Sequence, residues 1–138
     1  MADYIADRLS VQSLDHLVLS VADINATLAF YTRILGMEQQ VFHPNDTTRR
    51  HALTFGQQKI NLHDAAAPFE PCAAHPAPGS ADLCFLSDQP LTIWQAHLKA
   101  MNVAIEMGPV ARTGATGAIT SLYVRDPDGN LIEIANRG

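Results

Sequence analysis

The apolar residues of this chain run through the same order of elements twice, and this internal repeat limits the fold more than any other feature. Each half reads as a strand, a helix and three further strands. In the first half, these elements are expected at residues 14–21, 24–35, 37–43, 48–55 and 58–63. In the second half, they are expected at residues 81–86, 89–101, 103–107, 118–125 and 130–136, with a glycine-rich loop at 108–117. Asp23 and Asp88 are expected to cap the two helices at their N-termini. Because each half alone would leave a sheet face exposed, the repeat predicts an α+β fold of two tandem βαβββ modules that form a cupped mixed sheet around a central cleft.

The length of 138 residues and the hydrophobic content of 47% are sufficient for one compact domain. We expect an N-terminal leader at 1–12 and a single domain at 13–136. Within that domain, module one covers 13–63 and module two covers 81–136. Four prolines and many alanines mark residues 64–80 as a linker between them.

The charge and cysteine content exclude several function classes. A net charge of -5 gives no basic surface for nucleic acid, and no apolar run reaches the length of a membrane span. The N-terminus has no basic segment followed by an apolar core, so a soluble, cytoplasmic protein that binds neither nucleic acid nor membrane is expected. Cys72 and Cys84 do not have metal-type spacing, and Cys84 is expected to be a small buried hydrophobe.

A tight turn, Asp126-Pro127-Asp128-Gly129, joins two strand-like segments near the C-terminus and predicts a hairpin. Glu133 lies on the second segment, on the face of Leu131 and Ala135. Burial of an unpaired carboxylate costs several kcal/mol, so Glu133 must be exposed, paired or bound to a metal. An exposed glutamate is the commoner case when the strand is considered alone.

Polar residues interrupt apolar strands at four equivalent places of the repeat, namely His16, His63 with Asn61 on the same face, Asp82, and Glu133. Imidazole nitrogen and carboxylate oxygen suit divalent ions such as Zn²⁺, Ni²⁺, Mn²⁺ or Fe²⁺. Each residue also has a structural interpretation. His16 could be a hydrogen-bonded core histidine, Asp82 could satisfy loop amides, and His63 could be a surface residue. Equivalent placement in the repeat favours a shared site.

Asn61 and three further residues are candidates for substrate binding. Arg112 lies in the glycine-rich loop, which could close over an anionic or carbonyl substrate or be an ordinary connection. Tyr123 and Arg125 share a strand face whose parity aims them towards Glu133. Arg125 could equally be a structural partner of Asp126 or Asp128.

Two long segments of the chain, LDHLVLSVADINATLAFYTRILGM and YVRDPDGNLIEI, resemble the vicinal oxygen chelate superfamily. This superfamily includes glyoxalase I, extradiol dioxygenases, fosfomycin-resistance enzymes and bleomycin-binding proteins. The segment QKINLHDAAAPFEPCAAHPAPGSADLCFL between them is similar to the branch of glyoxalase domain-containing protein 5 and the lactoylglutathione-lyase-like proteins. The resemblance covers residues 13–136.

The resemblance implies one divalent metal, Zn, Ni, Mn or Fe, held by His16, the residue at Asn61, Asp82 and Glu133. Glyoxalase I has Glu where Asn61 stands, so either His63 replaces that ligand or water completes the site. The implied activity is a lyase or isomerase reaction on a 2-oxoaldehyde or thiohemiacetal, in which Glu133 moves a proton between adjacent carbons. A homodimer is expected. The alternatives are a small-molecule or antibiotic-binding resistance protein and an Fe(II) extradiol-type dioxygenase.

Overall fold

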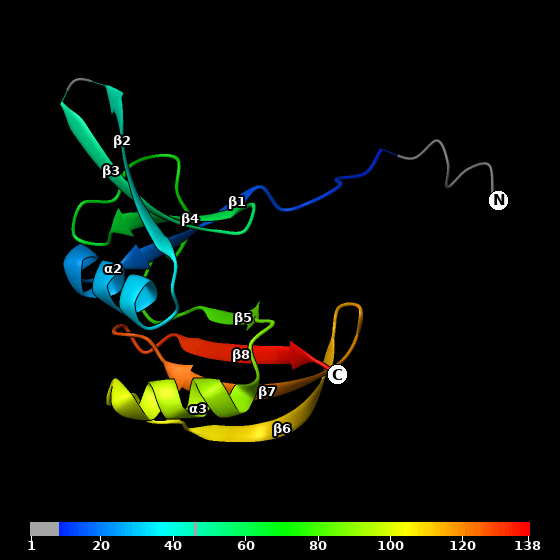
Figure 1. Ribbon diagram of the computed structural model, residues 1–138. Coiled ribbons are helices and arrows are strands. Elements are labelled where there is room, and N and C mark those ends of the chain that lie inside the picture. The colour runs from blue at the N-terminus through cyan, green and yellow to red at the C-terminus, as the bar shows by residue number, and fades with distance from the viewer. Residues whose placement is uncertain (1–8, 46) are drawn as a thin grey trace.

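The computed structural model describes residues 9–45 and 47–138 and contains two modules with the same order of elements (Figure 1). The first module consists of β1 (His16–Val21), α2 (Ile24–Arg33), β2 (Glu38–Asn45), β3 (Thr48–Phe55) and β4 (Gln58–Asp64). The second consists of β5 (Asp82–Leu86), α3 (Leu91–Ala100), β6 (Met107–Gly114), β7 (Gly117–Arg125) and β8 (Leu131–Arg137). The predicted leader at 1–12 lies outside the described residues except for 9–12.

Each module builds its own four-stranded mixed sheet. The strand order is β1-β4-β3-β2 in the first sheet and β5-β8-β7-β6 in the second. In both sheets, the opening strand of the module pairs in parallel with its last strand, while the other pairs are antiparallel. In Figure 1, α2 lies against the first sheet and α3 against the second. The prediction of an α+β fold with tandem βαβββ modules is therefore confirmed.

Local sequence explains α2 well and α3 only in part. The side chain of Asp23 accepts a hydrogen bond from the backbone N–H of Ala26 at 3.0 Å and caps α2, as predicted. Asp88 was expected to cap α3 in the same way, and this prediction is wrong, because α3 begins after Pro90. The first backbone N–H of α3, that of Leu91, donates instead to the side-chain oxygen of Asn136 on β8, at 3.0 Å. The cap is thus supplied by a residue distant in sequence.

The glycine-rich stretch 108–117 is mostly strand β6 and its hairpin to β7, so the prediction of a loop there is wrong. Its pairing shifts register between Met107 and Val110, and Gly108 at the shift has φ of +113°. A side chain at Gly108 would clash with the backbone oxygen of Ser121. Glycine therefore permits the close approach of β6 and β7, and hydrogen bonding to β7 overrides the weak strand propensity of this segment.

Buried side chains of both modules form one core, and aromatic and polar contacts tie the modules together. The rings of Phe55 and Phe85 meet edge to face, with centroids 5.4 Å apart. The hydroxyl of Tyr31 on α2 donates to the carboxylate of Asp126 in the β7–β8 turn at 2.7 Å, and both residues are buried. None of the helices within 9–45 and 47–138 is long and apolar enough to cross a membrane.

The turn between β7 and β8 has the predicted hairpin form. The backbone N–H of Gly129 donates to the carbonyl of Asp126 at 3.0 Å, and Gly129 has φ of +86°. Asp126 also accepts from the backbone and side chain of Asn130. Asp126 is therefore occupied within the turn and by Tyr31, and it is not the partner of Arg125.

Candidate functional site

Each sheet has one face covered by its helix and one face turned away from it, here called the open face. On β1, Leu19 and Val21 point into the core, while His16 and Val18 are exposed on the open face. On β8, Ile132 and Ile134 are buried in the core and Glu133 lies half-buried between them. The period of two along a strand thus places the candidate site residues on the open faces.

The two open faces carry their polar residues at matching positions. His16 begins β1 and Asp82 begins β5, as the repeat predicted. Two residues further along each opening strand, Val18 pairs with Asn61 and Cys84 pairs with Glu133. Asn61 is therefore the structural counterpart of Glu133.

In the first module, His16 and Asn61 each present a side-chain atom that bonds no residue within 9–45 and 47–138. The Nδ1 atom of His16 lies 2.8 Å from a carboxylate oxygen of Asp15, and the side chain is 43% exposed. A partner at Nδ1 leaves Nε2 as the atom available to a ligand. The side-chain oxygen of Asn61 is buried and has no hydrogen-bond partner among the described residues.

His63 is held by the linker rather than beside His16. It pairs with Ser20, four residues along β1 from His16, which corresponds to about 13 Å of strand. Its ring packs on Phe69, with centroids 4.3 Å apart, and the guanidinium of Arg50 lies 3.5 Å from the centre of the same Phe69 ring. Burial, and then the charge of Arg50, lower the pKa of His63, which favours a neutral imidazole.

In the second module, Glu133 has two polar neighbours, Ser121 and Cys84. The hydroxyl of Ser121 donates to its carboxylate in a short hydrogen bond. The Cys84 thiol lies beside it, and the partial burial of this thiol, followed by its interactions with Glu133, raises the pKa of Cys84 to about 11. The expectation that Cys84 is a buried hydrophobe is wrong, because alternate residues of β5 face the open side and Cys84 is exposed there.

The remaining candidates surround this carboxylate on neighbouring strands. Tyr123 pairs directly with Glu133, so the predicted parity of β7 is confirmed, and its hydroxyl accepts a hydrogen bond from the Arg112 side chain at 3.0 Å. Arg125 forms an ion pair with Glu106 at 3.0 Å. The hydrogen bond to Glu106, with its charge and that of Asp82, raises the pKa of Arg125. The alternative pairing of Arg125 with Asp126 or Asp128 is therefore wrong.

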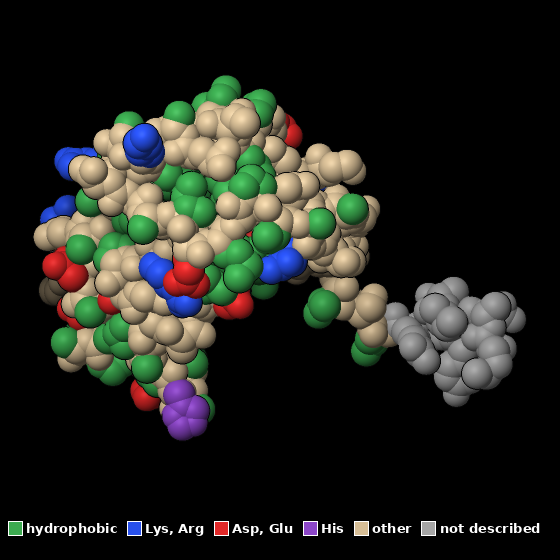
Figure 2. Space-filling model, turned by 90° about the horizontal axis from the view of Figure 1, so that it is seen from below, with side chains coloured by type: hydrophobic (Ala, Val, Ile, Leu, Met, Phe, Trp, Pro, Cys, Tyr) green, Lys and Arg blue, Asp and Glu red, His purple; other side chains and the backbone are tan. Residues whose placement is uncertain are grey.

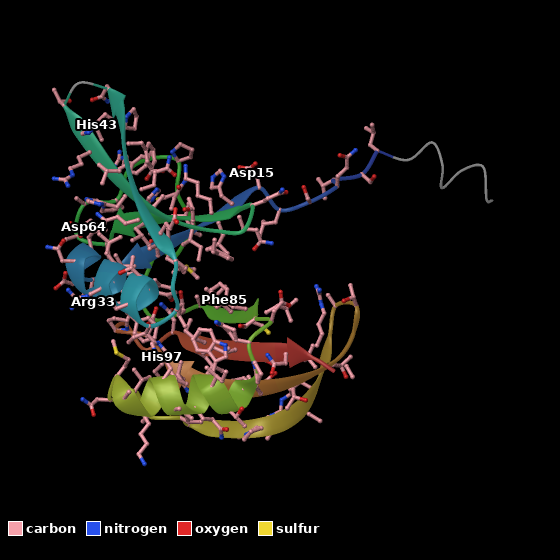
Figure 3. All side chains as sticks on the ribbon, in the orientation of Figure 1. Asp15, Arg33, His43, Asp64, Phe85 and His97 are labelled. Carbon is pink, nitrogen blue, oxygen red and sulfur yellow. The ribbon has the colours of Figure 1, made fainter. Side chains whose placement is uncertain are left out.

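Two cavities lie near these residues. One of about 350 Å³ occupies the open face of the second sheet and is lined by Cys84, Leu86, Arg112, Ile119, Glu133 and Arg137. The other, of about 490 Å³, lies between the modules and includes Arg33, Phe85 and His97, which Figure 3 labels at the junction of α2, β5 and α3. The Nε2 atom of His97 lies 2.9 Å from the carbonyl oxygen of Ile34 and joins α3 to the end of α2.

Within residues 9–45 and 47–138, no three His, Cys, Asp or Glu side chains of one chain lie close enough to hold a metal ion. His16 and Asn61 lie on one sheet, and Asp82 and Glu133 lie on the other. One chain thus presents two separate halves of the predicted ligand set.

Comparison with known proteins gives the family. The model of the Glyoxalase/Bleomycin resistance protein/Dioxygenase superfamily matches residues 13–134. The chain belongs to this superfamily. It is 49% identical over 128 residues to the virulence protein STM3117 of Salmonella typhimurium, covering 93% of this chain and 86% of that protein. It is 50% identical over 129 residues to the glyoxalase domain-containing protein RDO1 of Mycosarcoma maydis, covering 94% of this chain and 70% of that protein.

Solved structures of the superfamily have the same fold. The integron cassette protein VCH_CASS1 of V. cholerae aligns with a TM-score of 0.89 and 50% identity over 95% of this chain and 99% of that one. Lactoylglutathione lyase of Agrobacterium tumefaciens aligns with a TM-score of 0.68 and 25% identity over 92% and 95% of the two chains. TnmS3, an antibiotic-binding protein of Streptomyces sp. CB03234, aligns with a TM-score of 0.72 at 20% identity over 95% and 100% of the two chains, which shows a shared fold only.

In this member of the superfamily, the donor atoms fit a divalent cation. The free Nε2 of His16, the unpartnered oxygen of Asn61 and the carboxylates of Asp82 and Glu133 form a nitrogen and oxygen set. Such a set suits Zn²⁺, Ni²⁺, Mn²⁺ or Fe²⁺.

Sequence reasoning missed Arg137 and the contacts of Cys84 with Glu133. The alternation of side chains along β5 and β8 could have predicted both, because it places Cys84 and Arg137 on the same face of the sheet as Glu133.

Proposed function

We propose that the protein is a glyoxalase-like, divalent-metal-dependent lyase or isomerase for a small oxygen-chelating substrate of the 2-oxoaldehyde or thiohemiacetal type. The observation that carries this proposal is the carboxylate of Glu133, half-buried in a cavity of about 350 Å³ and hydrogen-bonded by Ser121. A carboxylate in such a position can take a proton from a bound substrate. The similarity to a lactoylglutathione lyase supports the same reaction class.

The metal ligands in this proposal are His16, Asn61, Asp82 and Glu133. Asn61 is preferred to His63 because it is the counterpart of Glu133 in strand register and has a free oxygen, whereas His63 is packed on Phe69. A divalent ion bound by these groups would supply Lewis acidity towards neighbouring substrate oxygens.

We assign the complete site to a homodimer, in which His16 and Asn61 come from one chain and Asp82 and Glu133 from its partner. The two halves lie on different sheets of one chain, and no set of ligands gathers among the described residues of that chain. The open faces also expose large apolar side chains, Val18 on the first sheet and Leu86 and Met107 on the second. A second copy would cover these side chains and bring the two halves together.

We assign the proton transfer to Glu133. Its carboxylate would remove the proton from the carbon beside the substrate carbonyl and return it to the adjacent carbon, so that the two carbons exchange oxidation level with no external oxidant. The Ser121 hydroxyl and the Cys84 thiol would hold the carboxylate in place. Tyr123 and Arg112 are adjacent donors for substrate oxygens.

The test is metal content and turnover measured on the same protein. Protein purified without added metal should contain a stoichiometric divalent ion and convert the thiohemiacetal of methylglyoxal and glutathione. Glu133→Gln should lower turnover by roughly a hundredfold or more while the fold survives, since general-base catalysis is worth that much. Glu106→Gln, which removes a carboxylate paired with Arg125 outside the cavity, is the control and should keep its activity. Full activity in Glu133→Gln would refute the assignment.

A non-enzymatic small-molecule binder is the second candidate, because the cavity between the modules is largely apolar. It is about 490 Å³ in volume, and its walls include Phe55, Phe85 and Trp94. Pockets of this size and character hold drug-sized ligands. Absence of bound metal, together with no thermal shift when metals are added, would favour this function over the enzyme.

A further inference from the structure

The cavity on the open face of the second sheet arises from three successive rows of cross-strand neighbours. The first row contains Glu133 with Cys84 and Tyr123 on either side. The next row contains Leu86, which lines the cavity, beside Ala135 and Ser121, which are fully buried.

The third row carries positive charge, in contrast to the carboxylate of Glu133 in the first row. Arg112 pairs with Ile119, and Ile119 pairs with Arg137, so two arginines flank one isoleucine on the same face. Strand spacing places their Cα atoms about 10 Å apart. Both side chains line the same cavity as Glu133, and the planar fork of a guanidinium matches a carboxylate. The Arg112 side chain turns towards Tyr123 and Met107, in the row of Glu133.

Neither arginine is neutralised by the residues that the structure describes. Ion pairs between described side chains join His16 to Asp15 and Arg125 to Glu106. Arg112 bonds only neutral groups, namely the Tyr123 hydroxyl, its neighbour's carbonyl and the Met107 sulfur. Both guanidinium groups thus retain their positive charge at the cavity wall, in a chain whose net charge is -5.

From this arrangement we infer that the cavity takes a small substrate with a carboxylate at one end, bound by Arg137, and its reacting carbons at the other end, beside Glu133. The Arg112 guanidinium, which bonds Tyr123, lies between the two ends. The inference rests on the proposed function for the role of the Glu133 end. Glu133 and Arg137 are four residues apart on β8, about 13 Å of strand. Their side chains fill part of that length, so the space left suits a chain of a few carbons.

Binding of butyrate to the metal-free protein tests the arginine end alone. Butyrate should bind saturably at constant ionic strength, observed by NMR titration, and neutral butyramide of the same shape should not. Arg137→Gln should weaken butyrate binding by roughly tenfold or more, the usual loss for a charged hydrogen bond. Arg112→Gln also loses the bond to Tyr123, so Arg137→Gln is the cleaner variant.

Two controls make the result decisive. Arg49→Gln removes an exposed arginine on β3, in the other module, and should leave butyrate binding unchanged. Glu133→Gln should bind butyrate at least as tightly as the unaltered protein, because the substitution removes a carboxylate that repels the butyrate anion. The inference is overturned if butyrate does not bind saturably, if butyramide binds equally well, or if Arg137→Gln binds butyrate as the unaltered protein does. Because no metal or turnover is involved, failure here leaves the isomerase proposal standing, and failure of that proposal leaves this one testable.

Discussion

Glu133 is surrounded by polar groups from two neighbouring strands of its sheet. Ser121 and Tyr123 on β7 and Cys84 on β5 lie next to it on the open face. A thiol in contact with a carboxylate resists ionisation, because the thiolate would face a like charge. The ionisation of Cys84 therefore reports the charge on Glu133.

Glu133→Gln should lower the pKa of Cys84 from about 11 and speed its alkylation. The pKa should remain above that of an ordinary cysteine, because burial is the larger cause of the shift and does not change. Below the pKa, the thiolate fraction rises roughly tenfold for each unit that the pKa falls. The measurement is the rate of iodoacetamide labelling against pH in metal-free protein with Cys72→Ser. A labelling rate unaffected by Glu133→Gln at pH 8 would show that the two side chains are not coupled.

Among the elements, α2 and the β7–β8 turn form the most specific contact between the modules. The Tyr31 hydroxyl reaches Asp126 across the core, and burial, with the nearby carboxylates, raises the pKa of Tyr31 far above that of a free tyrosine. The phenol therefore stays a proton donor at every ordinary pH. It satisfies a carboxylate that is itself buried.

Tyr31→Phe should destabilise the fold by about 1.5–3 kcal/mol, since it deletes a buried hydrogen bond to a charged group. Urea unfolding followed by circular dichroism measures the change. Tyr123→Phe makes the same chemical change on the open face and should shift stability by less than about 0.5 kcal/mol. Equal effects of the two substitutions would show that the Tyr31–Asp126 contact has no special role in joining the modules.

Contacts between elements also explain why two sequence-based predictions, the loop at 108–117 and the cap of α3, were wrong. Residues 108–114 have the composition of a loop, yet they form β6 because β7 supplies hydrogen-bond partners. The N-terminus of α3 is capped by Asn136 of β8 instead of the nearby Asp88. Both features depend on residues brought close by the fold, so a local pattern could not reveal them.

At the scale of the whole molecule, the chain carries one half of the proposed metal site on each sheet. Its surface mixes charged and hydrophobic side chains. On the face shown in Figure 2, acidic and basic side chains lie in small groups with hydrophobic side chains between them. His16 and Asn61 belong to the first sheet, and Asp82 and Glu133 to the second. If two chains complete each other's sites, a defect in either half can be compensated by a partner that carries the other defect.

His16→Ala and Glu133→Gln should each be inactive alone and active when the two variants form mixed dimers. A mixed dimer would have one doubly altered site and one intact site, so an equal mixture should recover about a quarter of the unaltered activity by symmetry. Turnover of the co-expressed chains is the measurement, with the heterodimer fraction determined by native mass spectrometry. Inactive mixtures that contain heterodimers would place the whole site within a single chain.

The sequence by itself determined the repeat, the two modules and the faces on which His16, Asn61, Asp82 and Glu133 lie, because strand periodicity and turn chemistry are local. Only the tertiary structure showed that Asn61 is the counterpart of Glu133 while His63 packs on the linker, since strand register depends on pairing. The tertiary structure also placed Arg137 and Arg112 on either side of Ile119. These residues are 25 positions apart in the chain, and only the folded sheet makes them neighbours.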